Sequence, residues 1–254
     1  MKKLMKTYQG LETYEGNANA DQIITLAANN RIITHVGTSV EFYFKKQNKL
    51  RLNFKTSQGG RSIYCNGSQV ISYDGVTMNY SNFQAGNDLK ATREILAKRA
   101  GVGSVFDPLF FLSGVPIPAN LVNLTMKPNE KLNDKPTMVL TGELKTPAQQ
   151  VTLKDGKKAT NPASTALWTW WIDKNTYLLS KIEMRVNKIP QVIIVVDKKD
   201  KKKRSLRQIL TNLIIRQNIT GVKSNGQIDE KLFAFAPPPG SKETKSADEL
   251  IKLK

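Results

Sequence analysis

Apolar and polar residues alternate along much of this chain. Alternation with a period of two is typical of a β-strand that buries one of its faces. The pattern is clearest around a polar turn at 47–49, where the apolar positions are Val40, Phe42, Phe44, Leu50, Leu52 and Phe54. Two alternating runs joined by a short polar turn predict a β-hairpin, here formed by 32–45 and 50–55.

The next strands are short and follow one another closely. Runs at 61–65, 69–73 and 77–80 are separated by Asn66-Gly67 and Asp74-Gly75. Such dipeptides favour two-residue hairpin turns, because both central positions need a positive φ angle. With a strand at 16–27 in front, the sequence predicts a meander of antiparallel strands up to residue 83.

The second half of the chain continues the strand pattern over longer runs. We predict a loop at 160–164, a charged hairpin loop at 197–204, and strands at 121–126, 137–144, 149–153, 166–172, 177–186, 189–196 and 206–219. A final strand is predicted at 232–236, with Phe233 and Phe235 on one side. Prolines follow at 237–239, and because proline has no N–H to donate to a sheet, they end this strand.

Helices are predicted at 3–12, 88–100 and 103–113, where the apolar period changes from two towards 3.6. The third helix is apolar nearly all round, with Val105, Phe106, Leu109, Phe110, Phe111 and Leu112. A surface helix normally keeps one polar face. This helix is therefore either a plain core helix or a lid over an apolar cavity.

These elements predict a mainly β fold with helices (α+β) in one domain that spans 1–254. No internal repeat, linker or break in composition divides the sequence. A single antiparallel sheet of this size must curl. Helices inserted in mid-chain are then expected to cover its concave face.

The strand predicted at 166–172 is apolar on both faces. Trp168, Trp170 and Ile172 fall on one face, and Leu167 and Trp171 fall on the other. Such a strand needs cover from two layers. A cavity for acyl chains accounts for both this strand and the apolar helix. Burying each CH₂ group contributes about 0.8 kcal/mol, so such a site needs no polar motif.

The net charge of +18 predicts attraction to nucleic acid, an acidic membrane surface or an acidic protein. The basic run at 198–204 is either a solvated hairpin tip or a nucleic-acid contact. Most aromatic residues alternate with polar ones inside strands, which favours burial over stacking on bases. We therefore expect no nucleic acid as a partner.

Residue types that carry catalysis are scarce. Cys65 and His35 are the single cysteine and histidine, which excludes an intrachain disulfide and a Cys/His zinc site. Without a nucleophile–base motif or a glycine-rich phosphate loop, we expect no enzyme, no metal and no cofactor.

No run of the sequence approaches the ~20 apolar residues that a membrane-spanning helix needs. The first residues are basic but lack a following apolar segment. The protein is therefore either cytoplasmic or has had a signal peptide removed.

Three segments, in this order, resemble motifs of the lipoprotein carrier (LolA) family and its relatives, which include LolB. Residues 42–51 (FYFKKQNKLR) resemble F-x-V-K-R-P-x-x-L-R, residues 72–80 (SYDGVTMNY) resemble x-S-D-G-x-x-L-W-x-Y, and residues 233–240 (FAFAPPPG) resemble F-x-F-x-P-P-x-G. Residues 170–173, followed by a turn and a strand, fit the second half. The resemblance spans nearly the whole chain. It implies an open half-barrel closed by helices, with acyl chains in an apolar cavity.

The resemblance also implies a helical lid insertion at 87–113 and a flexible tail at 241–254. The lipid-binding residues expected in the cavity and lid are Phe42, Phe44, Leu50, Leu52, Phe54, Met78, Tyr80, Val105, Phe106, Leu109, Phe110, Leu112, Trp168, Trp170, Ile182, Met184 and Leu213. Lys46 stands where the family has an arginine that bonds to the lid, and Gln47 replaces the next proline. Lysine lacks the planar fork of arginine, so Lys46 is a weaker candidate for lid control. The segment 121–158 is longer than in the carriers, which indicates a divergent relative.

We therefore expect a non-enzymatic periplasmic carrier that binds acyl chains of lipoproteins or other lipids and transfers them towards the outer membrane. Its expected partners are an inner-membrane donor, an outer-membrane acceptor and, transiently, an anionic membrane surface. The protein is expected to act as a monomer. One alternative is a lipid-sensing or protein-interaction module of the same fold, and a remote alternative is a basic nucleic-acid-binding protein.

Overall fold

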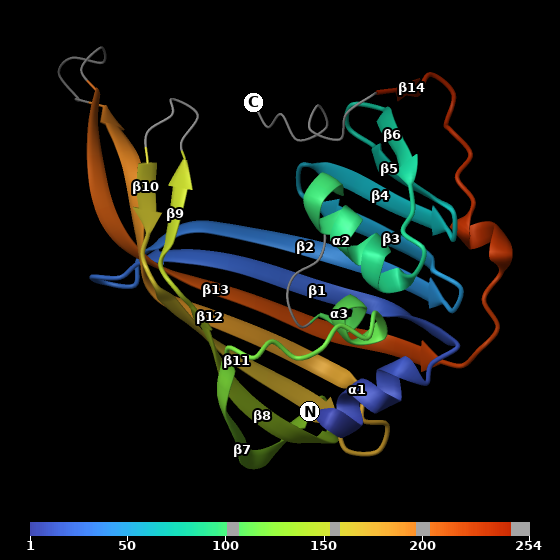
Figure 1. Cartoon of the computed structure of the whole chain (residues 1–254), viewed down its shortest axis with the longest axis horizontal. Helices are drawn as coiled ribbons and strands as arrows, with labels where there is room; N and C mark the ends of the chain where they lie inside the picture. The colour runs from blue at the N-terminus through green and yellow to red at the C-terminus, as the bar shows by residue number, and fades with distance from the viewer. Residues whose placement is uncertain (101–106, 153–157, 197–203, 245–254) are drawn as a thin grey trace.

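Within the residues that the computed structural model describes, 1–100, 107–152, 158–196 and 204–244, one curved sheet of twelve strands dominates (Figure 1). The strand order is β14-β6-β5-β4-β3-β2-β1-β13-β12-β11-β8-β7, and β9 and β10 form a separate two-stranded sheet. The strands are β1 (Thr13–Leu26), β2 (Ile32–Lys45), β3 (Lys49–Thr56), β4 (Gly59–Asn66), β5 (Gln69–Asp74), β6 (Asn79–Gln84), β7 (Leu121–Leu132), β8 (Lys135–Thr146), β9 (Gln149–Thr152), β10 (Lys158–Asn161), β11 (Ser164–Asp173), β12 (Leu179–Val196), β13 (Arg204–Ser224) and β14 (Lys242–Glu243).

The mainly β fold and the meander of the first half are confirmed. Strands β1 to β6 are neighbours in chain order, and their pairings are antiparallel. Strand β1 also pairs with β13, from Tyr14 opposite Ser224 to Leu26 opposite Thr211. This pairing joins the two halves of the chain into one open sheet. Only the short β14 departs from the antiparallel pattern among the described strands, because it pairs parallel with β6.

The turn predicted at Asp74-Gly75 is longer than two residues. Asp74 pairs with Asn79, so the predicted tight turn at Asp74-Gly75 is wrong. The Asp74 Oδ1 atom accepts hydrogen bonds from the backbone N–H groups of Val76 (2.7 Å) and Thr77 (3.2 Å). These bonds stabilise a longer loop, and β6 consequently begins at Asn79 rather than at residue 77.

In the second half, the strands predicted at 177–186 and 189–196 are a single strand, β12. Its register against β13 shifts between Val186 and Ile189, and Lys188 has a φ angle of 55°. A bulge of this kind lets a strand continue past an irregular residue. The loop predicted at 160–164 is also partly wrong, since β10 continues to Asn161. The charged loop predicted at 197–204 lies outside the described residues, apart from Arg204, which begins β13.

The closing strand predicted at 232–236 is wrong. Residues Glu230–Phe233 form a 3-10 helix, η1, whose first turn is capped by Asp229. We call residues 225–244 the C-terminal strap, because this segment runs from the end of β13 to the edge strand β6 (Figure 1). Lys242 and Glu243 of the predicted flexible tail form β14, and residues 245–254 lie outside the described part of the chain.

The helices are α1 (Lys2–Gln9), α2 (Leu89–Ala100) and α3 (Pro108–Leu112). In α2 the buried residues are Leu89, Thr92, Leu96 and Ala100, a spacing that places them on one face of the helix. Helix α3 begins where the Asp107 side chain accepts a hydrogen bond from the backbone N–H of Phe110 at 2.8 Å. Residues 103–106 of the helix predicted at 103–113 lie outside the described residues. None of the helices in the described part of the chain is long and apolar enough to cross a membrane.

All three helices contribute to the same core as one face of the sheet, and Figure 1 shows them along one side of it. The ring centroid of Tyr8 in α1 lies 5.3 Å from that of Tyr14 in β1 and 5.6 Å from that of Phe111 in α3. Tyr14 in turn stacks on Phe42 of β2 at 5.1 Å. We call this side of the sheet, which bears Phe42, the inner face, and the opposite side the outer face.

Candidate functional site

The inner face carries most of the residues that the sequence predicted for a cavity. Cross-strand partners in an antiparallel pair lie on the same face of a sheet. Their pairings are Val40 with Phe54, Phe42 with Leu52 and Phe44 with Leu50 in the first half, and Trp168 with Met184, Trp170 with Ile182 and Val186 with Leu213 in the second half. Ala20 of β1 pairs with both Thr38 and Gln217, so one continuous inner face links the two halves.

A cavity of about 310 Å³ lies between this face and α3. Strands β1, β2, β3 and β13 form its floor, and α3 contributes Leu109 and Leu112 from the other side. Its lining is Tyr14, Ala20, Thr38, Val40, Phe42, Tyr43, Phe44, Leu50, Leu52, Phe54, Asp107, Pro108, Leu109, Leu112, Ile215 and Gln217. The volume is near the lower end of the ~300–1,000 Å³ typical of ligand pockets, and the lining is mainly apolar. Such a space suits one narrow apolar chain.

The predicted residues fall into three groups. Those that line the cavity are Phe42, Phe44, Leu50, Leu52, Phe54, Leu109 and Leu112. Those that share the inner face beyond the cavity are Trp168, Trp170, Ile182, Met184 and Leu213. Phe110 is buried in α3, where its ring packs edge-on against Phe111 at 5.2 Å. Val105 and Phe106 lie outside the described residues.

Two predicted residues do not belong to the cavity. Tyr80 pairs with Tyr73 on the outer face, where both rings contact Phe235 of the strap at centroid distances of 5.3 and 5.7 Å. Met78 lies in the loop before β6, with a φ angle of 56°, and is 39% exposed. Both errors follow from the position of the loop after Asp74, because a strand that starts elsewhere than predicted presents its alternate residues differently.

The contact expected from Lys46 is made to a different segment. Its Nζ forms an ion pair with Glu12, and its backbone N–H donates to the Glu12 carbonyl at 2.8 Å. Glu12 lies between α1 and β1, away from α2 and α3 in the sequence. Lys46 therefore ties the β2–β3 hairpin to the start of β1.

Arg61 of β4 makes the helix contact that sequence reasoning assigned to Lys46. Its Nη1 donates to the carbonyl oxygen of Ala100, at the C-terminal end of α2, at 2.6 Å. Its Nε and Nη2 donate to the Ser72 Oγ at 3.0 and 2.9 Å. A cation is favourable at a helix C-terminus, where the dipole is negative. Burial lowers the pKa of Arg61, and the nearby Asp74 carboxylate partly opposes this shift.

Asn48 fixes the other end of α2. This buried residue lies in the β2–β3 turn, and its Nδ2 donates at 2.9 Å to both the Gly86 carbonyl and the Thr92 Oγ1. Helix α2 is therefore bonded at both ends to side chains from the sheet. The signal that sequence analysis overlooked was a charged residue, Arg61, on the face of β4 that otherwise carries Ile63 and Cys65.

Residues 2–245 match the model of a family described as a predicted periplasmic protein, DUF2092. The chain belongs to this family. The description of the family confirms the periplasmic location expected from the sequence. No curated protein matches this DUF2092 sequence.

Solved structures similar to the DUF2092 chain share little sequence with it. An uncharacterized conserved protein from Thermus thermophilus has 10% identity and a TM-score of 0.45, over 96% of this chain and 98% of that one. The lipoprotein LppX from Mycobacterium tuberculosis has 12% identity and a TM-score of 0.38, over 90% and 94%. A LolA superfamily protein from Nitrosomonas europaea has 10% identity and a TM-score of 0.34, over 92% and 97%. With all three TM-scores below 0.5, the description of the fold rests on the strand order of the chain itself.

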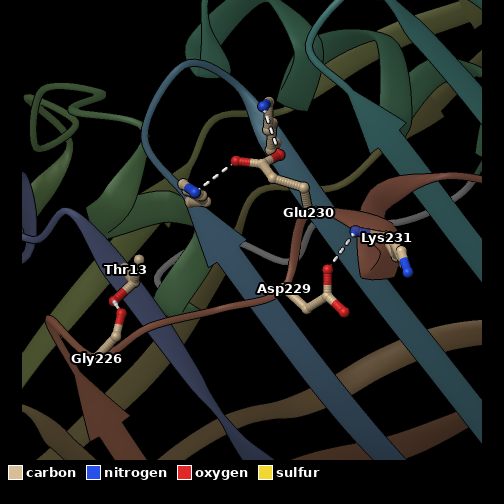
Figure 2. A network of polar contacts seen from close by, with 7 residues as sticks. Thr13, Gly226, Asp229, Glu230 and Lys231 are labelled. Atoms are coloured by element: carbon tan, nitrogen blue, oxygen red, sulfur yellow. Dashed lines mark hydrogen bonds and ion pairs between the residues drawn. The ribbon is translucent and has the colours of Figure 1, made fainter.

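The outer face of the DUF2092 chain is bound by its own strap. Glu230, labelled in Figure 2, accepts hydrogen bonds from two lysines of the β2–β3 hairpin. Lys45 Nζ donates to its Oε1 at 2.5 Å and Lys49 Nζ to its Oε2 at 2.6 Å. At the start of the strap, Thr13 Oγ1 donates to the Gly226 carbonyl at 2.8 Å. The β2–β3 hairpin therefore contacts the strap through its lysines and α2 through Asn48.

The groups most suited to nucleophilic chemistry have ordinary structural partners. The buried Cys65 thiol contacts the Asn48 carbonyl at 3.0 Å, and burial raises the pKa of this thiol, which disfavours the reactive thiolate. His35, the single histidine, is not the partner of this thiol, because its Nε2 lies 2.9 Å from Asp21 Oδ1 on the surface. In the described part of the chain, no group of three or more His, Cys, Asp or Glu residues is arranged to hold a metal ion.

Proposed function

We propose that the chain is a non-enzymatic periplasmic carrier that binds acyl chains of lipids or lipoproteins and transfers them towards the outer membrane. The observation that supports this proposal is the apolar cavity of about 310 Å³ between the inner face and α3. A chain that leaves water for such a cavity gains about 0.8 kcal/mol per buried CH₂. Affinity of this origin needs no polar motif, which fits the composition of the lining.

In this proposal the helices cover the concave face of the sheet, and residues 87–113 act as the lid. Leu109 and Leu112 of α3 form one wall of the cavity, so exchange of cargo requires α3 to move. Arg61 and Asn48 hold α2 at its two ends and so favour the closed state. When the lid opens, the stacked rings of Trp168 and Trp170 offer further apolar surface on the same face.

Transfer would follow relative affinity, from an inner-membrane donor to an outer-membrane acceptor with a more apolar site. The net charge of +18 supports transient contact of a monomer with anionic membranes. The outer-face rings of Tyr64, Tyr73 and Tyr80 are in contact with Phe235, which argues against a surface for stacking bases.

A substitution that fills the cavity tests the proposal directly. Ala20→Trp places a large ring on the cavity floor, and Asn19→Trp places the same ring on the outer face of the same strand. The delipidated variants are titrated with an apolar fluorescent probe, which is then displaced by a triacylated lipopeptide. We expect saturable binding to the unsubstituted protein and to Asn19→Trp, and at least roughly tenfold weaker binding to Ala20→Trp.

Equal binding by both variants, or binding abolished by moderate salt, would contradict an apolar site on the inner face. Transfer is tested separately, by mixing the loaded protein with vesicles and following cargo release. Retention of cargo in the presence of vesicles and an outer-membrane extract would favour the lipid-sensing alternative over the carrier.

A further inference from the structure

A cluster of hydrogen-bond donors lies where the C-terminal end of α2 meets β4, next to Phe54 of the cavity lining. The Arg61 guanidinium carries five N–H groups, and three of them donate, to Ser72 Oγ twice and to the Ala100 carbonyl once. Two of its N–H groups therefore have no partner among the described residues. Ser72 accepts in both of its described side-chain hydrogen bonds, so its own O–H remains available as a donor.

Ser81 adds a further donor to this cluster. It pairs with Ser72 across β5 and β6, which places the two side chains on the same face. Ser81 is only 3% exposed, and its Oγ has no hydrogen-bond partner among the described residues. A buried hydroxyl without a partner is costly, so its presence points to a group that is bound in another state of the protein.

The cluster lacks a carboxylate partner for the charge of Arg61 among the described residues. Asp74 is its cross-strand neighbour, but the Asp74 Oδ1 atom accepts from the backbone N–H groups of Val76 and Thr77. A partly buried guanidinium that is bonded to neutral oxygens retains a strong preference for an anion. The Asp74 carboxylate offsets part of the charge of Arg61 without forming an ion pair with it in the described part of the chain. The surplus of donors on Arg61, Ser72 and Ser81 therefore favours an anionic ligand.

The cluster and the cavity are adjacent. Arg61 pairs directly with Phe54, which lines the cavity. Asp107 is the acidic residue of the lining and caps α3. Phe111 of α3 contacts Tyr8, which in turn contacts Tyr14, so α3 marks the Tyr14 end of the cavity. Tyr14 pairs with Phe44 of β2, and Phe54 pairs with Val40, four residues away on the same strand. At about 3.3 Å per residue, the Tyr14 end and the Phe54 end of the cavity are about 13 Å apart. An anionic group at Arg61 would be attached to a chain that extends away from it into the apolar space.

We propose that Arg61, Ser72 and Ser81 bind the anionic head group of a single-chain amphiphile whose hydrocarbon chain occupies the cavity. This inference rests on the proposed function, and it narrows the ligand class to a carboxylate or a phosphate monoester on one chain. Binding of the head group replaces the Ala100 carbonyl as the acceptor for Arg61. The ligand thereby loosens the C-terminal end of α2 as it binds.

The test compares dodecanoate, dodecyl phosphate and dodecanol, below the concentrations at which they form micelles, as competitors of an apolar fluorescent probe. The three ligands share one chain length and differ only in the head group. We expect the protein to bind at least one of the two anions about tenfold tighter than the alcohol, as a charge-assisted hydrogen bond allows. The tighter anion identifies the head group.

Substitutions locate the effect. Arg61→Gln is expected to abolish the preference for the anion over dodecanol, measured as the ratio of the two affinities within the same variant. Arg51→Gln is the matched control, because Arg51 lies on the outer face of the neighbouring strand, 5.1 Å from the ring centroid of Tyr64. Ser81→Ala, which removes a hydroxyl without a described partner, is expected to weaken anion binding several-fold without loss of thermal stability.

Equal affinity of the unsubstituted protein for dodecanol and for both anions would overturn this inference while leaving the apolar site intact. An unchanged preference for the anion in Arg61→Gln would overturn it as well. If Arg61→Gln does not fold, the comparison of head groups and the Ser81→Ala variant decide. Failure of all three ligands to displace the probe would instead contradict the proposed function.

Discussion

Gly16 shows how closely the strands pack at the edge of the cavity floor. A Cβ atom on Gly16 would lie 2.8 Å from Phe42 Cζ and 3.1 Å from the carbonyl oxygen of Thr220. Phe42 lines the cavity, so a methyl group at this position would both strain the strand and displace the cavity wall.

Gly16→Ala is therefore expected to lower the free energy of unfolding by about 1–3 kcal/mol, measured by urea denaturation. Gly37→Ala is the control in the paired strand, because the nearest atom to its added Cβ would be Asp21 Oδ1 at 3.8 Å. Equal losses in the two variants would show that the effect arises from β-strand glycine in general rather than from the contact with Phe42.

Two buried tyrosines predict a loss of stability in alkali. Burial raises the pKa of Tyr8 to about 12, although its hydrogen bonds with Tyr14 and with the Leu179 N–H oppose this shift, and burial raises the pKa of Tyr14 well above its usual range. A pKa that is raised in the folded state gives stability that is complete below the unfolded pKa, about 10. This stability is lost as the pH rises towards the folded pKa.

The free energy of unfolding is accordingly expected to fall above about pH 10, by a few kcal/mol at most on approaching about pH 12, since one pKa unit is about 1.4 kcal/mol. Tyr14→Phe removes one titrating group and should make the fall shallower, with little change at neutral pH. Chemical denaturation over a series of pH values measures both slopes. A steeper fall in Tyr14→Phe than in the unsubstituted protein would contradict the assignment to this pair.

At the residue scale, the sequence predicts inner-face positions well where a strand is long and regular. Phe42, Leu52 and Phe54 lie on one face, as alternation within one hairpin predicts. Tyr80 lies on the other face, because the Asp74 side chain shapes the loop before it. A charge on an otherwise apolar face marks Arg61 locally, but its partner, Ala100, is 39 residues away in sequence, so no local pattern could identify the contact.

At the scale of elements, the β2–β3 hairpin connects the strap on the outer face with α2 on the inner face. Lys45 and Lys49 contact Glu230, whereas Asn48 between them contacts the start of α2. Hydrogen bonds from the two lysines lower the pKa of Glu230, which favours its ionised form. Release of the strap would remove one of the contacts that hold the hairpin in place.

Phe235 is the main aromatic anchor of the strap beyond η1. Its ring contacts Tyr64, Tyr73 and Tyr80 at centroid distances of 5.2, 5.7 and 5.3 Å. Phe235→Ala should weaken docking of the strap by about 2 kcal/mol, which limited proteolysis would detect as faster cleavage within residues 230–244. Lys231→Ala is the control, since the described hydrogen bond of Lys231 uses its backbone N–H. Equal cleavage rates for both variants would contradict an anchoring role.

The error at 232–236 shows what an alternating pattern leaves open. Phe233 and Phe235 alternate with alanines as in a strand, yet Phe233 is buried in η1 and Phe235 packs on a cluster of tyrosines. Alternation indicates that the two aromatic side chains are buried on one side of the segment. It does not show whether a paired strand or another element buries them. By contrast, the boundaries of β2 agree with its pattern, because a short turn and a neighbouring strand fix it locally.

At the scale of the whole molecule, the pairing of β1 with β13 determines the shape. These strands are separated by most of the chain, and their pairing carries the inner face from the first half to the second. Local patterns predicted most of the strands and the order of the first half, whereas β8 pairs with β11 rather than with the next strand along the chain. The junction between the halves is a non-local choice, set by the burial of one continuous apolar face.

The far ends of the long strands suit the proposed contact with anionic membranes. Ile32 is 60% exposed, Ile33 is 46% exposed, and Leu210 in β13 is 49% exposed. The Ala27 N–H donates to the Leu210 carbonyl at 2.9 Å, so the β1–β2 turn and this part of β13 lie side by side. Exposed apolar side chains at one end of a chain with a net charge of +18 combine hydrophobic insertion with attraction to acidic lipids.

The double substitution Ile32→Ser with Ile33→Ser is therefore expected to weaken binding to vesicles of an anionic phospholipid several-fold, as measured by co-sedimentation. Val76→Ser is the control, because Val76 is 64% exposed but lies in the β5–β6 loop. Raising the salt concentration should weaken binding of all variants, since each basic residue near the surface contributes about 1 kcal/mol at low salt. If the double variant binds as the control does and only salt has an effect, the contact is electrostatic over the whole molecule. The isoleucines at the β1–β2 turn would then have no part in directing the carrier to the membrane.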